Sequence, residues 1–277
     1  MISDTGLVLG CIPYLNCVPF FACLEDNGFQ GHFVAGVPSA LNRLLQEGGI
    51  DASPSSSFEY ARHWRDYLLL PGHSIASVGE VRSVMFFSPV ELNELEEQQI
   101  AITGDSATSI NLLRIILREF YSLKNVTDVV PGEPIETLIA RKKPALLIGD
   151  RALRMALKPP EGIKVFDLGQ LWFQHTGLPF VFALWMIRRT SFNQHADQLV
   201  TLGQQLLQSR EQVLADPQNF VAAAVESSGI NAEVIIDYWK TIDYRLDDEH
   251  KKGLKLFFQL CQKYNFLEDE PELNFLN

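Results

Sequence analysis

The sequence predicts an α/β fold in two lobes joined by a hinge, and three features indicate it. The first third alternates short apolar strand patterns with amphipathic helix patterns, which is typical of a largely parallel sheet. A second series of the same kind begins near residue 100. Two long apolar stretches, 81–88 and 178–187, could carry the chain out of one lobe and back. We therefore expect a hinged cleft between lobe 1, residues 1–87 and 180–277, and lobe 2, residues 88–179.

In lobe 1, strands are expected at residues 7–12, 32–34 and 50–52. Asn16 should cap the helix after the first strand, with Pro19 in the first turn, where a missing N–H group does little harm. A helix over 37–47 ends at a glycine pair. From residue 191 the pattern becomes helical. We expect these helices to pack on lobe 1, and residues 268–277 to form a loose tail.

In lobe 2 the elements alternate regularly. The expected order is a strand near residue 100, a helix at 107–120, a strand at 126–130, a helix at 134–142, a strand at 145–148, a helix from Asp150 and a strand at 164–168. This alternation again predicts a mostly parallel sheet.

Composition excludes several classes of function. The 277 residues are 47% hydrophobic, enough for a large core, and 34 acidic against 23 basic residues give a formal charge of −11. Nucleic-acid binding is therefore not expected, and no apolar run is long enough to span a membrane. The first residues do not resemble a signal peptide, so we expect a cytoplasmic protein.

The four cysteines, Cys11, Cys17, Cys23 and Cys261, form no CxxC pair and have no histidine at ligand spacing. This argues against a zinc site or a disulfide framework, and we expect free thiols. The sequence also contains no P-loop and no G-x-G-x-x-G pattern, so no metal and no nucleotide cofactor are expected.

The stretch 99–114 is the most informative, because an apolar strand runs through a hydroxyl-rich turn into an amphipathic helix. Ser106 is placed to cap that helix. Ala107, Thr108 and Ser109 supply first-turn N–H groups and hydroxyls that can bind an anion. The alternative is that Ser106 only caps the helix.

Other predicted strands end in similar polar residues: Tyr14 and Asn16, Ser56 and Ser57, and Asp150. In α/β sheets ligands bind beyond the carboxyl ends of strands, so these residues could face one cleft. Each of them alone could be an ordinary cap. Together they favour a site for a small anion with several oxygen atoms.

Further candidates lie on or beside the expected hinge strands. Ser83 and Ser88 are hydroxyls in an apolar strand pattern, where each needs a partner, although a backbone bond could satisfy either. The stretch 167–180 could wall the cleft. His73 and His175 could act as general acid or base, but a lone histidine is more often structural.

Motifs spread in order over residues 7–188 resemble the chorismate dehydratase family of the futalosine route to menaquinone. They are Tyr14-Leu-Asn16, Gly36-Val-Pro38 with Leu41-Asn42, Ser56-Ser57-Phe-Glu-Tyr-Ala-Arg62, Leu69-Leu-Pro71, Ser74-Ile75, Val81-Arg-Ser-Val84, Thr103 with Ser106-Ala-Thr-Ser109, Gly149-Asp150 with Ala152-Leu153, Asp167-Leu-Gly169, and Thr176-Gly-Leu-Pro-Phe-Val-Phe-Ala183.

The resemblance implies a type II periplasmic-binding-protein-like fold and conversion of chorismate to 3-[(1-carboxyvinyl)oxy]benzoate and water, without a cofactor. It leaves a homodimer open. It makes Asn16 and Ser83 the expected catalytic residues. The expected substrate-binding residues are Tyr14, Ser56, Ser57, Ser106, Ala107, Thr108, Ser109, Asp150, Gly177, Leu178 and Pro179.

No strongly basic side chain stands out in these motifs. Our hypothesis is that the enolpyruvyl carboxylate of the substrate takes the ring proton, while Asn16 and Ser83 orient the substrate and stabilise the departing hydroxyl. Glu59 or His73 as a conventional base is the alternative. Two other functions stay open: the related naphthoate-forming synthase of the same pathway, and a non-catalytic protein that binds small anions.

Overall fold

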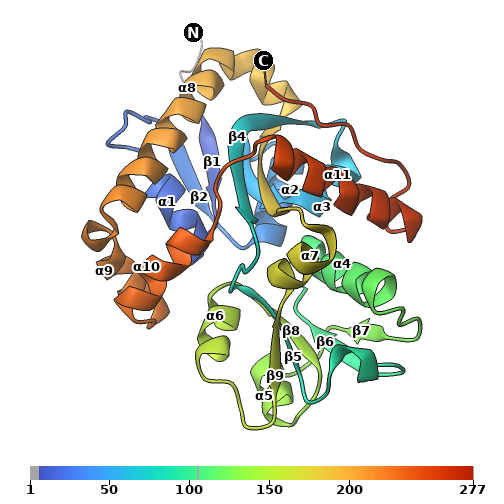
Figure 1. Cartoon of the computed structure of the whole chain (residues 1–277). Coiled ribbons are helices and arrows are strands. Elements are labelled where there is room, and N and C mark those ends of the chain that lie inside the picture. Colours follow the sequence, from blue (N-terminus) through green and yellow to red (C-terminus); the bar gives the residue numbers. More distant parts are fainter. Residues whose placement is uncertain (1–5, 105, 277) are drawn as a thin grey trace. The chain divides into compact units, whose positions relative to one another are not determined.

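Two compact units make up the chain in a computed structural model that describes residues 6–104 and 106–276 (Figure 1). Within these residues, unit 1 covers 6–75, 182–247 and 271–276, and unit 2 covers 76–181 and 248–270. The N-terminal residues 1–5, on which part of the targeting expectation rests, lie outside the described residues.

Unit 1 is built on a five-stranded sheet in the order β2-β1-β3-β10-β4. β1 (Val8–Cys11) pairs in parallel with β2 (His32–Ala35) and β3 (Ala52–Ser56), and β3 pairs antiparallel with β10 (Phe180–Arg188). β4 (Tyr67–Ser77) is an edge strand. The strands expected at 7–12 and 32–34 are confirmed. The third strand is longer than expected and includes Pro54, opposite Trp185 of β10.

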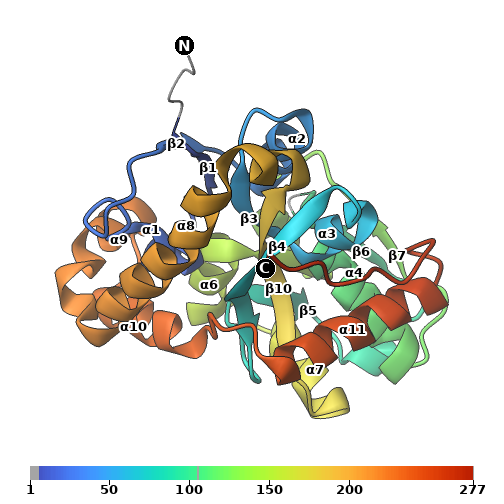
Figure 2. The same ribbon diagram turned by 90° about the horizontal axis from the view of Figure 1, so that it is seen from above.

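Helices cover both faces of this sheet. Figures 1 and 2 show α1 and α8 together on one face and α2 and α3 on the other. The helices of unit 1 are η1 (Leu15–Cys17), α1 (Val18–Phe21), α2 (Pro38–Glu47), α3 (Ser57–His63), α8 (Arg189–Ala215), η4 (Pro217–Asn219), α9 (Val221–Ser228) and α10 (Ala232–Thr241). As expected, α2 ends at Gly48, which has a left-handed backbone at φ 82°.

Unit 2 has a second five-stranded sheet in the order β7-β6-β8-β5-β9. β6 (Gln99–Ile102) pairs in parallel with β7 (Thr127–Val129) and β8 (Ala145–Ile148). β5 (Val84–Ser88) runs antiparallel to both β8 and β9 (Lys164–Asp167). All the strands expected from residue 100 onward are therefore present.

The helices of unit 2 include those expected at 107–120, at 134–142 and from Asp150. They are η2 (Leu92–Glu94), α4 (Ala107–Ile115), the π-helical turn η3 (Ile116–Phe120), α5 (Ile135–Ala140), α6 (Gly149–Leu157), α7 (Leu168–Thr176) and α11 (Asp248–Lys263). Ile135 and Ile139 of α5 and Ala152 of α6 pack with Met85 and Phe87 of β5 in one core. Trp172 of α7 lies in a separate aromatic group.

The observed units differ from the expected lobes in three places. β4, which the sequence analysis did not identify as a strand, runs across the boundary after Ile75, whereas β5 lies wholly in unit 2 because its partners are β8 and β9. α11 belongs to unit 2, not to lobe 1. Its Phe257 ring lies 5.0 Å from that of Phe180, and its Lys263 Nζ lies 2.6 Å from Glu119 Oε2.

The expectation of a loose C-terminal tail is wrong for the described residues. Leu69 N donates to Asn274 O at 2.7 Å, and Leu276 N donates to Leu69 O at 2.9 Å. The Tyr60 hydroxyl donates to Glu272 O at 2.6 Å and accepts from Asn274 N at 2.8 Å. The tail therefore extends the edge of the unit 1 sheet along β4. Among the described residues, every helix is too short or too polar to cross a bilayer.

Candidate functional site

In unit 1 the candidate residues gather at one edge of the sheet. β1 and β3 are parallel, so the residues that follow them lie at the same edge. Tyr14 is the N-cap of η1, Asn16 lies inside η1, and Ser56 and Ser57 stand where β3 passes into α3. The unit 1 residues selected from the sequence therefore all lie at or just after the ends of strands at this edge of the sheet.

Asn16 does not cap α1, which corrects the sequence prediction. It occupies a 3₁₀ turn whose cap, Tyr14, makes no side-chain cap bond. α1 begins at Val18 with Cys17 as its N-cap, and Pro19 lies in its first turn as expected. The Oδ1 atom of Asn16 is buried and has no hydrogen-bond partner among the described residues. An unsatisfied buried oxygen costs about 1–3 kcal/mol, so this atom is placed to take a hydrogen bond from a ligand.

The three serines at the junction of β3 and α3 have different roles. The Ser56 hydroxyl accepts from Glu59 N at 3.2 Å and caps α3. Ser57 is fully buried at the first position of α3. Ser55, which the sequence analysis did not select, has a buried hydroxyl without a partner among the described residues. The run of three serines was the available signal, but without the strand register it did not separate Ser55 from its neighbours.

In unit 2 the start of α4 has the expected form. Ser106 Oγ accepts from Ser109 N at 3.3 Å and lies 3.1 Å from Ser109 Oγ. Thr108 and Ser109 are buried, and no acidic residue occupies the first turn. The N-terminal end of the helix dipole and the two hydroxyls therefore favour negative charge at the start of α4.

Ser83 and Asp150 lie at the same edge of the unit 2 sheet as α4. Gly149 N donates to Ser83 O at 2.7 Å, which joins the start of α6 to the residue before β5. The buried Ser83 hydroxyl has only a long bond, 3.4 Å, to Val81 O. Ser88, at the other end of β5, is instead well satisfied by Val90 O at 2.8 Å. This contrast favours Ser83 over Ser88 as a functional residue.

Asp167 holds the backbone just before Ser83. Its carboxylate accepts from Val81 N, from Arg82 N at 2.6 Å, and from Gln170 N at 3.1 Å. Burial raises the pKa of the Asp167 carboxyl, while these N–H groups act in the opposite direction. From the sequence, Asp167 could be assigned to a family motif but not to a role. The hydrogen bonds that define its role are made with backbone atoms of residues remote in sequence, Val81 and Arg82.

Residues 177–179 follow α7. Gly177 has φ 70° and ends the helix, and Leu178 N donates to Thr176 Oγ1 at 3.1 Å. Pro179 O closely approaches Gly253 of α11, where a Cβ atom would lie only 2.0 Å away. The position of this segment is therefore fixed by α7 and α11 together.

The alternative bases are placed less favourably. Burial lowers the pKa of His73 to about 4, and its Nε2 lies 3.0 Å from Gly203 O of α8. His175 is exposed and stacks on Phe120 at 4.4 Å. Glu59 lies 3.6 Å from His63 Nε2, in the first turn of α3. Of the three, Glu59 is hydrogen-bonded to a residue of the selected set, because its N–H donates to Ser56 Oγ.

No group of three His, Cys, Asp or Glu side chains within 6–104 and 106–276 could hold a metal ion, and all four cysteines are free thiols.

Comparisons with known proteins identify the family. A family model described as menaquinone biosynthesis matches residues 7–263. The chorismate dehydratase of Thermus thermophilus is 35% identical over 264 residues, which are 90% of this chain and 93% of that protein. The chorismate dehydratase of Campylobacter jejuni is 32% identical over 183 residues, 64% of this chain and 66% of that protein.

The periplasmic aliphatic sulphonate binding protein SsuA of Escherichia coli has a similar structure, with a TM-score of 0.71 and 13% identity over 98% of this chain and 91% of that chain. At this identity the likeness shows the fold alone, and it confirms the expected periplasmic-binding-protein-like architecture. With a family model that matches most of its length and a relative that aligns nearly end to end, the chain belongs to the menaquinone biosynthesis family, which it shares with chorismate dehydratases.

Proposed function

We propose that this protein is a hydro-lyase that converts chorismate to 3-[(1-carboxyvinyl)oxy]benzoate and water. The relatives named chorismate dehydratase support the reaction, and the buried, unpartnered Oδ1 of Asn16 is the observation that carries the site. The substrate-binding candidates in unit 1 are Tyr14, Asn16, Ser56 and Ser57. Those in unit 2 are Ser83, Asp150, the residues 106–109 and the segment 177–179.

Chorismate has two carboxylates, and the start of α4 suits one of them. The hydroxyls of Ser106 and Ser109 can each donate a hydrogen bond to a carboxylate. The N–H groups of the first turn form the positive end of the helix dipole, which also favours negative charge. The second carboxylate, on the enolpyruvyl group, would stay closer to the reacting ring carbons and act as the base.

The reaction balances without any added reagent. The ring C–H bond at the carbon bearing the enolpyruvyl ether breaks, and its electron pair forms a ring C=C bond. The neighbouring C–O bond to the hydroxyl breaks, and the hydroxyl leaves with a proton as water. The product ring is aromatic, so positioning and one modest base are sufficient. In this scheme Asn16 and Ser83 orient the substrate and hydrogen-bond to the departing hydroxyl.

The test is to incubate the purified protein with chorismate, without metal or cofactor, and to identify products by liquid chromatography and mass spectrometry. We expect a product lighter by one water molecule. Asn16→Asp keeps the shape but replaces the amide by a negative charge, and should lower kcat at least 100-fold. Ser83→Ala should also lower kcat, whereas the matched variant Ser88→Ala should not, because Ser88 is satisfied within its own turn.

Intact chorismate in the presence of folded protein would contradict the proposal and favour the naphthoate-forming synthase or a non-catalytic anion-binding protein. An Asn16→Ala protein that turns over at the wild-type rate would remove Asn16 from the mechanism. The expected cytoplasmic location and the homodimer stay predictions from the sequence.

A further inference from the structure

Unit 1 contains a cavity between β4 and α8. None of its lining residues belongs to the set proposed to bind chorismate. Its volume is about 290 Å³. The lining is mainly apolar: Leu70, Pro71, Gly72, His73, Val200, Gly203, Gln204, Leu207, Arg210 and Leu276. Val200 is 53% exposed, an unusual position for a large apolar side chain, and lies where the cavity reaches the surface.

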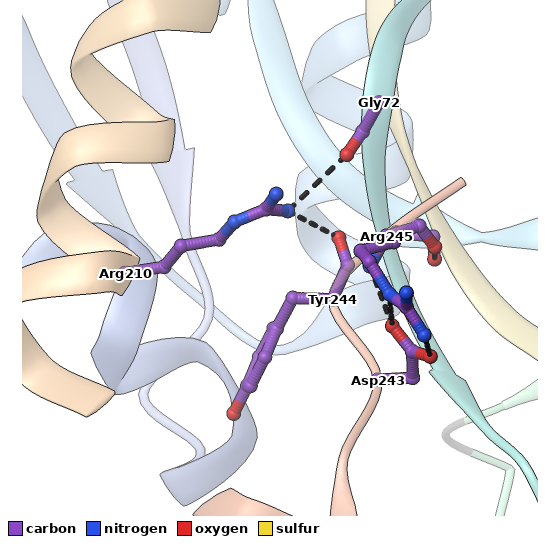
Figure 3. Close-up of polar contacts among 6 residues, drawn as sticks. Gly72, Arg210, Asp243, Tyr244 and Arg245 are labelled. Atoms are coloured by element: carbon purple, nitrogen blue, oxygen red, sulfur yellow. Dashed lines mark hydrogen bonds and ion pairs between the residues drawn. The ribbon is translucent and has the colours of Figure 1, made fainter. Parts of the chain in front are cut away.

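Arg210 is the sole charged residue among the described residues that line this cavity. Its Nη1 atom donates to Gly72 O at 3.2 Å and to Tyr244 O at 2.6 Å (Figure 3). Among the described residues, both hydrogen bonds of the guanidinium are made by Nη1, so Nη2 and Nε are left without a partner there. The guanidinium is thus fixed in place by one nitrogen, with its other edge available.

Two acidic side chains, Glu211 and Asp243, act electrostatically on Arg210, and among the described residues neither forms a hydrogen bond with its guanidinium. Asp243 binds Arg245 instead, with Oδ1 at 3.0 Å from Nε and Oδ2 at 2.6 Å from Nη2 (Figure 3). Burial lowers the pKa of Arg210, because the guanidinium has lost part of its hydration. An anion bound at the available edge would compensate for that loss.

His73 contributes no charge to the cavity. Its Nε2 is held against Gly203 O at 3.0 Å, and with a pKa of about 4 its imidazole is neutral near pH 7. Arg210 therefore provides a single positive charge beside apolar walls made by Leu70, Leu207 and Val200.

We propose that this cavity binds a small monocarboxylate with an apolar body. The Nε and Nη2 edge of a guanidinium matches the two oxygens of a carboxylate, and a pair of parallel bonds would orient it. The apolar body would contact the leucines and Val200. The volume is at the lower limit of ordinary ligand sites, which are roughly 300–1,000 Å³, so the ligand is small. A single cation among mainly apolar walls suits one carboxylate better than the higher charge of a phosphate.

Hexanoate is a suitable probe, and calorimetric titration at pH 7.5 is the first experiment. We expect hexanoate to bind and the neutral isostere hexanamide to bind at least tenfold more weakly. Chorismate at saturation should leave hexanoate binding unchanged, which separates this site from the proposed substrate site.

Variants then locate the bound probe. Arg210→Gln should weaken hexanoate binding at least tenfold, while the matched control Arg43→Gln, on α2 with a side chain 71% exposed, should not. Gly203→Leu is the second variant and is designed to fill the cavity while keeping Arg210 itself; a Cβ at this position would lie 3.6 Å from Leu70 Cδ1, an ordinary contact. Gly203→Leu should also abolish hexanoate binding. If Arg210→Gln does not fold, this variant alone tests whether hexanoate occupies the cavity.

The proposal is overturned if hexanoate does not bind, if it binds equally well to the Arg210→Gln and Gly203→Leu proteins, or if chorismate displaces it. None of these outcomes depends on whether the protein dehydrates chorismate, so failure here is distinguishable from failure of the proposed function.

Discussion

The carboxylate of Asp167 accepts the backbone N–H of Arg82 at 2.6 Å and so holds a strained turn immediately before Ser83. Arg82 has φ 61°, a left-handed conformation that costs a residue with a Cβ atom roughly 1–2 kcal/mol. The same carboxylate accepts from Gln170 N and caps α7. Asp167 thus joins the start of α7 to the turn that positions Ser83.

Asp167→Asn should lower both stability and kcat. The substitution places an amide NH₂ group against N–H donors, and an unsatisfied buried group costs about 1–3 kcal/mol. Released from this bond, the turn can relax and displace the Ser83 hydroxyl. We expect kcat for chorismate to fall about tenfold or more with a smaller change in KM, measured by steady-state kinetics alongside thermal unfolding.

Arg82→Gly provides the control for this positioning role, because glycine adopts φ 61° without strain. In the Asp167→Asn background it should restore part of the lost kcat. A double variant no more active than Asp167→Asn alone would mean that strain at Arg82 is not what the carboxylate opposes.

Replacing Ser106 separates its capping role from its role toward substrate. Asp and Asn are both good N-caps, so Ser106→Asp and Ser106→Asn should each keep the stability of α4 to within about 1 kcal/mol. The Asp variant adds a negative charge where we propose that a substrate carboxylate binds, and should raise KM for chorismate at least tenfold, whereas the Asn variant should raise it much less. Equal KM values for the two variants would argue that this helix start does not bind an anion.

Most of the fold could be predicted because the apolar periodicities are strong. β6, α4, β7, α5, β8, α6 and β9 all lie within a few residues of their expected positions. β4 was missed because Pro71-Gly72 interrupts its apolar pattern. The assignment of α11 to the wrong lobe has another cause. An amphipathic stripe shows that a helix packs, but its partner is set by tertiary contacts such as that of Phe257 with Phe180.

The candidate site was predictable where a local rule applies. Ser106 was expected to cap α4, and it does so through its bond to Ser109 N. Asn16 was assigned a cap that it does not make, since the 3₁₀ turn beginning at Leu15 shifts the helix start. The role of Asp167 depends on bonds to residues about 85 positions earlier, at Arg82 and Val81, which no local pattern encodes.

Stability should depend on pH through His73. Its folded pKa of about 4 lies below its ordinary value of 6.5, because burial and the nearby Arg210 charge disfavour the imidazolium. Between these values the unfolded chain binds a proton that the folded chain does not, so stability falls as pH decreases from 6.5 to 4. One pKa unit corresponds to about 1.4 kcal/mol, so the loss from this group is roughly 3 kcal/mol at its limit.

His73→Phe should remove this part of the pH dependence, measured as urea denaturation at several pH values from 7 to 4. The matched control His32→Asn replaces an exposed histidine and should leave the slope as in the wild type. An unchanged slope in His73→Phe would show that other groups cause the acid sensitivity. The same variant should retain its kcat for chorismate, and a large loss of kcat would instead support His73 as the base.

Replacement by alanine should change the stability of the protein in opposite directions at two helix glycines, Gly203 and Gly253. In an exposed helix interior Gly→Ala stabilises by about 1 kcal/mol, and Gly203→Ala in α8 should approach this gain because its nearest contact would be at 3.6 Å. Gly253→Ala in α11 would place Cβ 2.0 Å from Pro179 O, and backbone cannot yield cheaply. We expect it to destabilise the protein by about 1–3 kcal/mol.

Gly253→Ala should also affect substrate binding, because the displaced segment 177–179 belongs to the proposed substrate-binding set. We expect a higher KM for chorismate in Gly253→Ala and an unchanged KM in Gly203→Ala, with stability measured by urea denaturation in the same buffer. If Gly253→Ala were as stable as the wild type, the close approach of α11 to Pro179 would not be a constraint on this segment. If it were destabilised but kept its KM, residues 177–179 would act in folding and not in binding chorismate.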